Sequence, residues 1–414
     1  MGLSVTMIVI KRIFMPTIST DKKKIAELLS RGVAEVIVMD DLKKKLESGT
    51  QLRVKLGIDP TSPNLHLGRS IPLLKLRDFQ VLGHQIVFIV GDFTGIIGDT
   101  SDKDAERPML TEETIAKNLE TYVAQAGKII DLERAEIHFN STWLGKLGFK
   151  EIGELANVFS VAEFIARENI AKRLDGGKRV SLREVLYPLM QGYDSVAIRA
   201  DVELGGTDQR FNVLAGRTIQ PHYGQTAQNI VLNPLIAGLD GRKMSSSWGN
   251  TINLLDEPAD MYGKVMSLLD ELVLEYFMHA TRVDLDEIVA MRESLAAGTN
   301  PRDLKMRLGR EIVGMYWGVA AAEAAEEHFK TVHQQGGVPE DMPEMKVDWV
   351  QAPLVDVLVE SKLCSSKSEA RRQIEEDGVK VDGVVVEDVG AMIEMKGGPV
   401  VVQKGKRFFL RITK

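Results

Sequence analysis

Residues 52–99 decide the fold; they read LRVKLGIDPTSPNLHLGRSIPLLKLRDFQVLGHQIVFIVGDFTGIIGD. The run 52–59 is predicted to be a buried strand that ends at Asp59. A helix is predicted to begin near Gly68, because the apolar residues after it recur at helical intervals. The run HQIVFIV predicts a second buried strand, which leads into a glycine-rich loop. Strand, helix and strand in this order form a βαβ unit, from which parallel sheets are built.

The same alternation continues downstream of this unit. Further strands are predicted at 135–141 and 228–236, and residues 200–217 have the pattern of a strand, a turn and a helix. We therefore expect a doubly wound α/β domain with a Rossmann-like parallel sheet. In such sheets ligands bind at the carboxyl ends of the strands, where the chain order reverses. Upstream, residues 23–48 show only helical spacing.

The remaining chain predicts two further domains. We expect an N-terminal extension with helices at 1–44, the Rossmann-like α/β domain at 45–257, a helical domain at 258–335, a linker at 336–351 and a small α+β domain at 352–414. In the small domain a helix is predicted at 353–361. A second helix is predicted to begin at Ser366 with Glu369 as a capping box and to end at Gly378. An Asp-Gly turn in the run 379–388 predicts a hairpin.

Composition limits the classes of function. The chain has 414 residues, one cysteine and a formal net charge of −7. A single cysteine excludes an internal disulfide and fits a reducing cytoplasm, and no spacing of cysteine and histidine predicts a metal site. The first 15 residues are too short to span a bilayer and lack a cleavage signal, and Met15 is a more natural start than Met1. Residues 361–414 are basic, with 11 Lys and Arg against 8 Asp and Glu.

Two stretches near the predicted strand ends suit a nucleotide. Thr61, His66 and Gly68 lie where the first helix begins, and helix N-termini attract anions. A histidine that only caps the helix is the alternative. Further on, Asp99 is followed by Lys103 and Arg107, which suits a ligand with an amine at one end and phosphates at the other. A solvated charged loop is the alternative there.

A third stretch predicts a pocket for a small polar ligand. Tyr187, Gln191 and Asp194 are spaced i, i+4 and i+7, so they share one face of a helix. Gln and Asp are poor core residues, and the face therefore needs polar partners.

Two loops give weaker signals of a binding site. Gly205 and Gly206 permit close backbone approach beside Asp208, which could bind a ribose diol. Residues 241–250, GRKMSSSWGN, are either a surface turn or a mobile loop whose Lys243 closes onto an anion.

The set HLGR, GIDPT, GIIGD, YPLMQGYDS, GGTDQ and KMSSS resembles the tyrosyl-tRNA synthetases, which are class I aminoacyl-tRNA synthetases. The resemblance covers roughly residues 15 to 414, and it is to the bacterial branch with a C-terminal S4-type RNA-binding domain. It implies a tyrosine–tRNA ligase that uses ATP as Mg-ATP, binds tRNA(Tyr), holds no tightly bound cofactor and forms a homodimer. The helical domain would then contact the anticodon.

The resemblance also implies roles for single residues. The catalytic group would comprise Thr61, His66, Lys103, Arg107 and Lys243. Tyrosine would be bound by Gly57, Asp99, Tyr187, Gln191, Asp194 and Gln209, with Asp194 accepting from the phenol. ATP would contact Asp59, His66, Gly68, Arg69, Gly206, Asp208, Lys243, Met244, Ser245, Ser246 and Ser247. RNA would contact Lys362, Lys367, Arg371, Arg372, Lys404, Lys406 and Arg407 in the basic tail.

Three positions depart from the family pattern. Arg69 replaces the second histidine of the HIGH signature, and Ser246 replaces the second lysine of KMSKS. Lys55 stands where some relatives place a second contact to the tyrosine hydroxyl. Three rival functions remain: the tryptophan enzyme of the same fold, an inactive RNA-binding paralogue, and a nucleotidyltransferase that acts on a small molecule.

Overall fold

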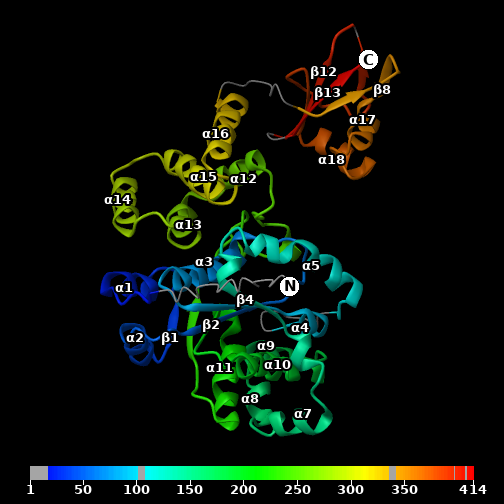
Figure 1. The fold of residues 1–414 in the computed structure, drawn as a ribbon. Helices are drawn as coiled ribbons and strands as arrows, with labels where there is room; N and C mark the ends of the chain where they lie inside the picture. Colours follow the sequence, from blue (N-terminus) through cyan, green and yellow to red (C-terminus); the bar gives the residue numbers. More distant parts are fainter. Residues whose placement is uncertain (1–16, 101–107, 335–341, 396, 406–407) are drawn as a thin grey trace, which may run out of the picture. The chain divides into compact units, whose positions relative to one another are not determined.

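A computed structural model of the chain describes residues 17–100, 108–334, 342–395, 397–405 and 408–414 (Figure 1). The chain forms two compact units. The first contains Met1–Leu255 and Leu274–Arg292, and the second contains Asp256–Val273 and Glu293–Lys414. Among the described residues, no helix combines the length and the apolar character needed to cross a membrane.

A six-stranded sheet forms the centre of the first unit. Its strands are β1 (Glu35–Ile37), β2 (Arg53–Ile58), β3 (Gln85–Val90), β4 (Ala135–Phe139), β5 (Val202–Gly206) and β6 (Asn229–Asn233). They lie in the order β1-β6-β5-β2-β3-β4. Every neighbouring pair from β6 to β4 is parallel. The chain runs outward from β2 to β4 and then returns to the other side of β2 at β5. The point of reversal therefore lies between β2 and β5, where doubly wound folds bind their ligands.

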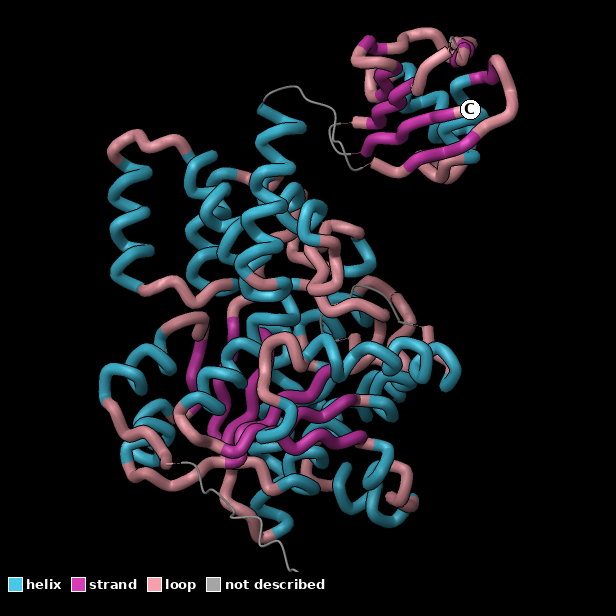
Figure 2. Tube along the Cα trace, turned by 45° about the horizontal axis from the view of Figure 1, so that its top comes forward, coloured by secondary structure: helices cyan, strands magenta, loops and turns pink. Residues whose placement is uncertain are grey.

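Helices cover both faces of this sheet (Figures 1 and 2). On one face α3 (Leu67–Val81) contacts β2, β3 and β5, and on the other α11 (Arg210–Ile219) contacts β5 and β6. Because both faces are covered, the central strands are buried, and residues 86–90 of β3, all apolar, are 0% exposed. The other helices that begin in this unit are α1 (Lys22–Ser30), α2 (Met39–Glu47), α4 (Asp92–Ile97), α5 (Glu112–Ala126), α6 (Ser141–Leu144), α7 (Phe149–Ala156), α8 (Val161–Ile165), α9 (Glu168–Asp175), α10 (Leu182–Ile198) and α14 (Leu285–Ala296).

The first unit differs from the sequence expectation in two elements. Residues 23–48 contain β1 as well as two helices, and β1 pairs antiparallel with β6, so the sheet is mixed at one edge. β1 has only three residues, and pairs such as Val36 with Val231 hold it in place. Local periodicity cannot reveal so short a strand. Residues after β3 form the short helix α4, where a loop is expected from the glycines.

The second unit contains a group of helices that begins at Pro258. These are α12 (Pro258–Met266), α13 (Val273–Ala280), α15 (Pro301–Trp317) and α16 (Val319–Gln334), of which α13 continues into the first unit. α12 packs against both α15 and α16. Gly309 makes the close approach possible, since an added Cβ there would lie 2.7 Å from the Tyr262 ring. As the sequence predicts, residues 258–334 contain no strand.

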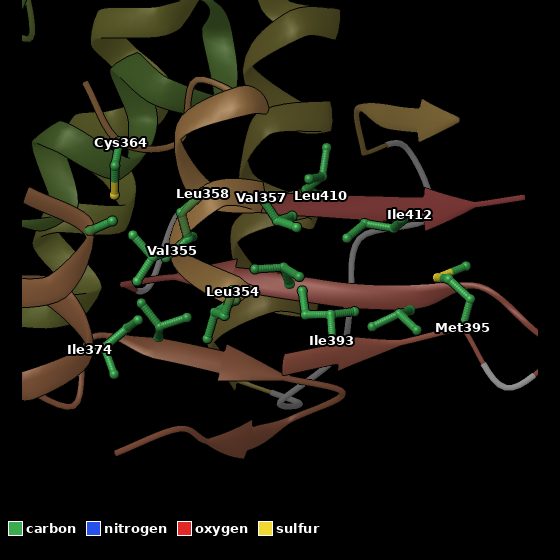
Figure 3. Packing of buried hydrophobic residues seen from close by; sticks show 14 residues of the cluster. Leu354, Val355, Val357, Leu358, Cys364, Ile374, Ile393, Met395, Leu410 and Ile412 are labelled. Atoms are coloured by element: carbon green, nitrogen blue, oxygen red, sulfur yellow. The ribbon is translucent and has the colours of Figure 1, made fainter. Parts of the chain in front are cut away.

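The C-terminal part of the second unit is a small α+β fold. A five-stranded sheet has the order β10-β9-β12-β13-β7, and two further strands, β8 and β11, pair antiparallel. The strands are β7 (Glu344–Lys346), β8 (Gln351–Pro353), β9 (Val379–Val381), β10 (Val384–Val385), β11 (Met392–Glu394), β12 (Val400–Lys404) and β13 (Phe408–Thr413); the helices are α17 (Leu354–Glu360) and α18 (Lys367–Glu375). Figure 3 shows their common core, to which Leu354 and Leu358 of α17, Ile393 of β11 and Ile412 of β13 all belong.

Several details of this small fold follow the sequence, and others correct it. Asp382 and Gly383 both have positive φ, as the predicted hairpin turn requires. Ser366 caps α18 as predicted, but the Glu369 carboxylate accepts from Ser365 and Lys404, so the capping box is incomplete. Asp377, with φ of 56°, takes the left-handed position after α18 that is expected of Gly378.

The predicted linker is shorter than its sequence indicates. Residues 344–346 lie within the run 336–351, yet they form β7 and pair parallel with β13. The backbone N–H of Arg411 also donates to the carbonyl of Pro343 at 2.9 Å. The run carries Gly and Pro and shows no periodicity, which hides a three-residue edge strand.

Candidate active site

A cleft of about 1020 Å³ opens at the carboxyl ends of the parallel strands of the first unit. It is lined by the residues that end β2, β3 and β5, and by residues that follow β4 and β6. The sequence-predicted residues that line it are Gly57, Asp59, Thr61, His66, Gly68, Arg69, Asp99, Tyr187, Gln191, Asp194, Gly206, Asp208, Gln209, Lys243, Met244, Ser245, Ser246 and Ser247. Lys103 and Arg107 lie outside the described residues. The structure therefore brings together every predicted catalytic-domain residue that it describes.

Asp194 is the buried acid of the cleft and is only 3% exposed. Its two oxygens accept from the Trp143 indole N–H at 2.7 Å and from the Asn140 amide at 3.3 Å. Burial raises the pKa of Asp194 to about 7, against the lowering effects of Lys55 and of these two donors. Each carboxylate oxygen has two lone pairs, so Asp194 retains the capacity to accept from a ligand hydroxyl.

Lys55 does not line this cleft, although it precedes Gly57 by two residues on β2. Its side chain is fully buried, and its ammonium lies 2.9 Å from Glu203 of β5. The ammonium also donates to Ser195 Oγ and to the backbone oxygen of Gln191, each at 2.8 Å. Among the residues that the sequence places near a substrate hydroxyl, Asp194 alone reaches the cleft.

Two polar clusters lie beside Asp194. In the first, Asp59 accepts from Thr94 Oγ1 and from the Tyr187 hydroxyl, each at 2.7 Å, and burial raises the pKa of Asp59 to about 6. In the second, Asp99 accepts from the Gln209 amide at 2.7 Å and from Asn212 at 3.4 Å. Carboxylates held in this way offer acceptors and negative charge to a cation such as an ammonium group.

The cleft is also lined by a helix N-terminus, that of α3. His66 is the N-cap of α3, and its Nδ1 is buried without a hydrogen-bond partner. Burial, and then the charges of Arg69 and Lys243, lower the pKa of His66 to about 3, so its ring is neutral at physiological pH. Gly68 keeps this end open, because an added Cβ there would lie 3.1 Å from the His66 ring. Free N–H groups and the helix dipole favour an anion at this place.

Arg69 supports the loop between β2 and α3. Its guanidinium donates to the backbone oxygen of Asp59 at 2.9 Å, to Thr61 Oγ1 at 3.0 Å and to the Tyr122 hydroxyl at 2.7 Å. Tyr122 is fully buried on α5 and also donates to the Asp59 carbonyl, at 3.1 Å. The residue that departs from the HIGH pattern is thus tied to the backbone of its own loop.

The loop that contains Lys243 closes the rim of the cleft. The Lys243 ammonium lies 2.8 Å from Asp208, which follows β5. Ser245 and Ser247 share a hydrogen bond at 2.9 Å, and Ser246 lies 3.4 Å from Ser62. Several hydroxyls and one cation are therefore gathered over the helix N-terminus.

Sequence reasoning missed four residues that support the site: Thr94, Tyr122, Asn140 and Trp143. A signal existed for Asn140, because it lies near the end of the strand predicted at 135–141; in the structure it directly follows β4 and so lies at the same sheet edge as Asp59. Trp143 carries no comparable signal, since its contact with Asp194 spans 51 residues of sequence.

The predicted RNA-binding residues belong to the C-terminal fold, and all of them follow the cleft-lining residues in the sequence. Lys362, Lys367, Arg371 and Arg372 are exposed around the start of α18. Lys367 also pairs with Asp356 at 2.7 Å, but its side chain stays 61% exposed. The Lys404 side chain is only 17% exposed; its ammonium lies 2.7 Å from Glu369 and donates to the Leu363 carbonyl. Lys404 thus contributes to the packing of this fold, and its contact with RNA stays a prediction. Lys406 and Arg407 lie outside the described residues.

Comparison with known proteins agrees with this geometry. Residues 46–334 match the family model of class I tRNA synthetases (W and Y), and residues 334–412 match that of the tyrosine–tRNA ligase SYY-like C-terminal domain. A tyrosine–tRNA ligase of Moorella thermoacetica is 49% identical over 391 residues, which cover 93% of this chain and 94% of that protein. A tyrosine–tRNA ligase of Burkholderia lata is 45% identical, covering 92% and 93%.

Solved structures share the fold at lower identity. A C-terminally truncated mitochondrial tyrosyl-tRNA synthetase of Coccidioides posadasii has a TM-score of 0.62 at 24% identity, covering 74% of this chain and 92% of that one. A tyrosyl-tRNA synthetase of Archaeoglobus fulgidus complexed with L-tyrosine has a TM-score of 0.59 at 22% identity, covering 73% and 99%. The family match over most of the chain and the close full-length relatives show that the chain belongs to the class I tRNA synthetases, in the group of the tyrosine–tRNA ligases.

Proposed function

We propose that this chain is a tyrosine–tRNA ligase that works in the cytoplasm. It activates L-tyrosine with Mg-ATP to form tyrosyl-adenylate and pyrophosphate, and it then transfers the tyrosyl group to the 3′ end of tRNA(Tyr). The observation that carries this proposal is the cleft itself. Its lining includes both a buried carboxylate, Asp194, and the N-terminus of α3. With the phenol bound at Asp194, the amino-acid carboxylate would meet phosphates bound at the helix N-terminus.

In the proposed first step, an oxygen of the tyrosine carboxylate attacks the α-phosphorus of ATP, and the bond to the β-phosphate oxygen breaks. The chain supplies positions and charges, and no enzyme nucleophile takes part. Asp99, Tyr187 and Gln191 would hold the α-ammonium, and Asp208 would bind the ribose. His66, Thr61 and the N-terminus of α3 would meet the phosphates. In the second step, a terminal tRNA hydroxyl attacks the carbonyl carbon and AMP leaves.

Lys243 has a specific proposed role in the first step. Its ammonium is bound to Asp208 in the described loop conformation. Movement of the loop would transfer this charge from Asp208 to the departing pyrophosphate. Charge that reaches the phosphates only as they separate stabilises the transition state more than the ground state.

The direct test is exchange of labelled pyrophosphate into ATP in the presence of single amino acids. We expect exchange with L-tyrosine and little with L-tryptophan or L-phenylalanine, because Asp194 needs a donor opposite it. Equal exchange with tryptophan would favour the tryptophan enzyme of the same fold. Absence of all exchange, with tRNA still bound, would favour an inactive RNA-binding paralogue.

We also propose that the chain works as a homodimer. Residues 149–182 of the first unit expose several large apolar side chains, which are typical of a surface that another protein covers. The most exposed are Phe149 (96%), Leu182 (73%) and Val161 (72%). Sedimentation equilibrium of the wild type and of a Phe149→Glu variant tests this, with a shift toward monomer expected in the variant.

A further inference from the structure

The buried pair formed by Lys55 and Glu203 lies directly behind the face of α10 that lines the cleft. The side chain of Lys55 is 0% exposed and that of Glu203 is 1% exposed. Two opposite charges removed from water in this way are costly unless hydrogen bonds satisfy their remaining donors and acceptors. A pair of well-packed apolar residues could fill the same space. Packing alone therefore does not explain why two charged residues are buried here.

Every polar group of the pair is satisfied, and most of the bonds reach α10. The three ammonium protons of Lys55 have partners in Glu203, Ser195 Oγ and the Gln191 carbonyl. Glu203 Oε1 accepts from the Gln191 amide at 3.2 Å, and Glu203 Oε2 accepts from Ser195 at 3.0 Å and from Gln228. Gln191 is thus held at both its backbone and its side chain.

The helix α11 packs closely against the pair at Gly216. An added Cβ at Gly216 of α11 would lie 2.7 Å from Ser195 Oγ and 3.2 Å from Glu203 Oε2. The glycine therefore lets α11 approach the pair closely. The charge of Lys55 also acts on Asp194, whose pKa it lowers against the larger raising effect of burial.

The chemistry of Glu203 fixes the orientation of the Gln191 amide. An ionised carboxylate only accepts hydrogen bonds, so the amide nitrogen of Gln191 must face Glu203. The amide oxygen is the other end of the same planar group, and Gln191 lines the cleft. An oxygen presented to the cleft accepts from an ammonium group, whereas a nitrogen there would repel it.

We propose that the Lys55–Glu203 pair is a positioning unit that turns the Gln191 amide oxygen toward the cleft and so selects substrates that carry an amino group. This proposal rests on the proposed function, in which the cleft binds tyrosine. It assigns no contact with substrate to either residue, since both act through Gln191.

The test compares two ligands that differ only in the amino group: L-tyrosine and 3-(4-hydroxyphenyl)propionate, its analogue without that group. Their dissociation constants are measured by calorimetry on the full chain. The main variant is Lys55→Met with Glu203→Leu, which removes both charges together and leaves no unpaired ion in the interior. We expect the preference for L-tyrosine over the analogue to fall about tenfold, the value that one charge-assisted hydrogen bond of roughly 1.4 kcal/mol supplies.

The ratio of the two constants separates positioning from general damage. Any effect on the phenol through Asp194 acts on both ligands and cancels in the ratio. A second variant, Lys55→Met with Glu203→Gln, keeps the shape of the pair in case the first fails to fold. A neutral amide at 203 can donate as well as accept, so the Gln191 amide is no longer locked, and the ratio should again fall, though less.

A matched control is Lys75→Met. Lys75 is also a buried lysine of this unit, 1% exposed, but its ammonium donates to the Leu28 carbonyl and it does not line the cleft. The control should keep the wild-type ratio. An unchanged ratio in the two pair variants, or an equal fall in the control, overturns the proposal. Failure of the wild type to bind L-tyrosine would instead refute the proposed function.

Discussion

The burial of Asp194 explains the preference for tyrosine over phenylalanine that we propose for the cleft. Its ionised form is disfavoured by burial, and its pKa of about 7 lies well above the ordinary value of 3.8. The phenol of tyrosine can donate to the ionised form, which compensates for lost hydration. The ring of phenylalanine cannot, so a buried acceptor is left unpaired.

Tyrosine specificity should therefore depend on pH. As pH falls from about 8 to about 6, Asp194 takes up a proton and the penalty against phenylalanine shrinks. The ratio of tyrosine affinity to phenylalanine affinity should fall across this interval. Titration of Asp59, with a pKa of about 6, acts on the binding of both ligands and cancels in the ratio. The measurement is calorimetric binding of both amino acids at several pH values.

The control for this prediction is Asp194→Asn. That variant has no group that titrates at position 194, so its lower tyrosine preference should be flat with pH. A wild-type ratio that stays constant over the interval would contradict the role proposed for Asp194.

Lys243 allows a separate prediction, because it lies at the phosphate end of the cleft. Lys243→Ala should lower the rate of adenylate formation on the order of 100-fold, as expected when one charged contact to the transition state is lost. The dissociation constant of tyrosine should remain close to that of the wild type. Single-turnover quench-flow and calorimetry measure the two quantities. Weaker tyrosine binding with an unaltered rate would mean that the loop is only a surface turn.

At the scale of single residues, the sequence predicted the residues that line the cleft better than the residues that hold them in place. Asp59, Gln191 and Asp194 could be predicted because strand ends and helix faces are periodic features of the sequence. Residues that hold them, such as Trp143, could not, because their contacts depend on tertiary packing between distant segments. Lys55 shows the same limit, since only the structure reveals its pairing with Glu203.

At the scale of elements, the junction between β2 and α3 explains the departure from the HIGH pattern. The guanidinium of Arg69 bonds to Asp59, Thr61 and Tyr122 at once, which requires its planar fork of donors. A lysine keeps the charge but offers a single nitrogen. Arg69→Lys should therefore lower the melting temperature by several degrees, corresponding to about 2 kcal/mol of lost hydrogen bonding. The Michaelis constant for ATP should rise as the loop loosens.

Tyr122→Phe is the matched control for this junction, because Tyr122 does not line the cleft. It removes only the bonds of one hydroxyl, so it should change both quantities in the same direction and by less. If Arg69→Lys changes the Michaelis constant for ATP but leaves the melting temperature unaltered, Arg69 would contact phosphate directly and would not serve as a support.

The long elements could be predicted from sequence, and the short ones could not. α3 and β3 have enough residues to show helical spacing or a continuous apolar run. β1 and β7 have three residues each, and pairing with β6 and β13 decides their conformation. Local propensity is a weak guide wherever tertiary pairing supplies most of the stability.

At the scale of the whole molecule, we propose that amino-acid activation belongs to the first unit and tRNA binding to the C-terminal fold. Among the described residues, those that line the cleft all fall within 56–248 of the first unit. The C-terminal fold has its own hydrophobic core and a group of exposed basic residues around the start of α18. Basic side chains that contact the RNA backbone give an affinity that falls as salt rises.

This division predicts the behaviour of a chain that ends at Pro343. The cut lies just before β7, so it removes the C-terminal fold as a whole and exposes no part of its core. The truncated chain should still exchange pyrophosphate with tyrosine at close to the wild-type rate. It should charge tRNA poorly, with the Michaelis constant for tRNA raised most at moderate salt. A full-length variant with Arg371→Glu and Arg372→Glu should reproduce the charging defect without removing the fold, while Lys404→Glu should instead lower the stability of that fold. Both reactions are measured on the same preparations.

Equal loss of exchange and charging on truncation would mean that the tail supports the catalytic unit. Full retention of charging would mean that the tail does not bind tRNA productively.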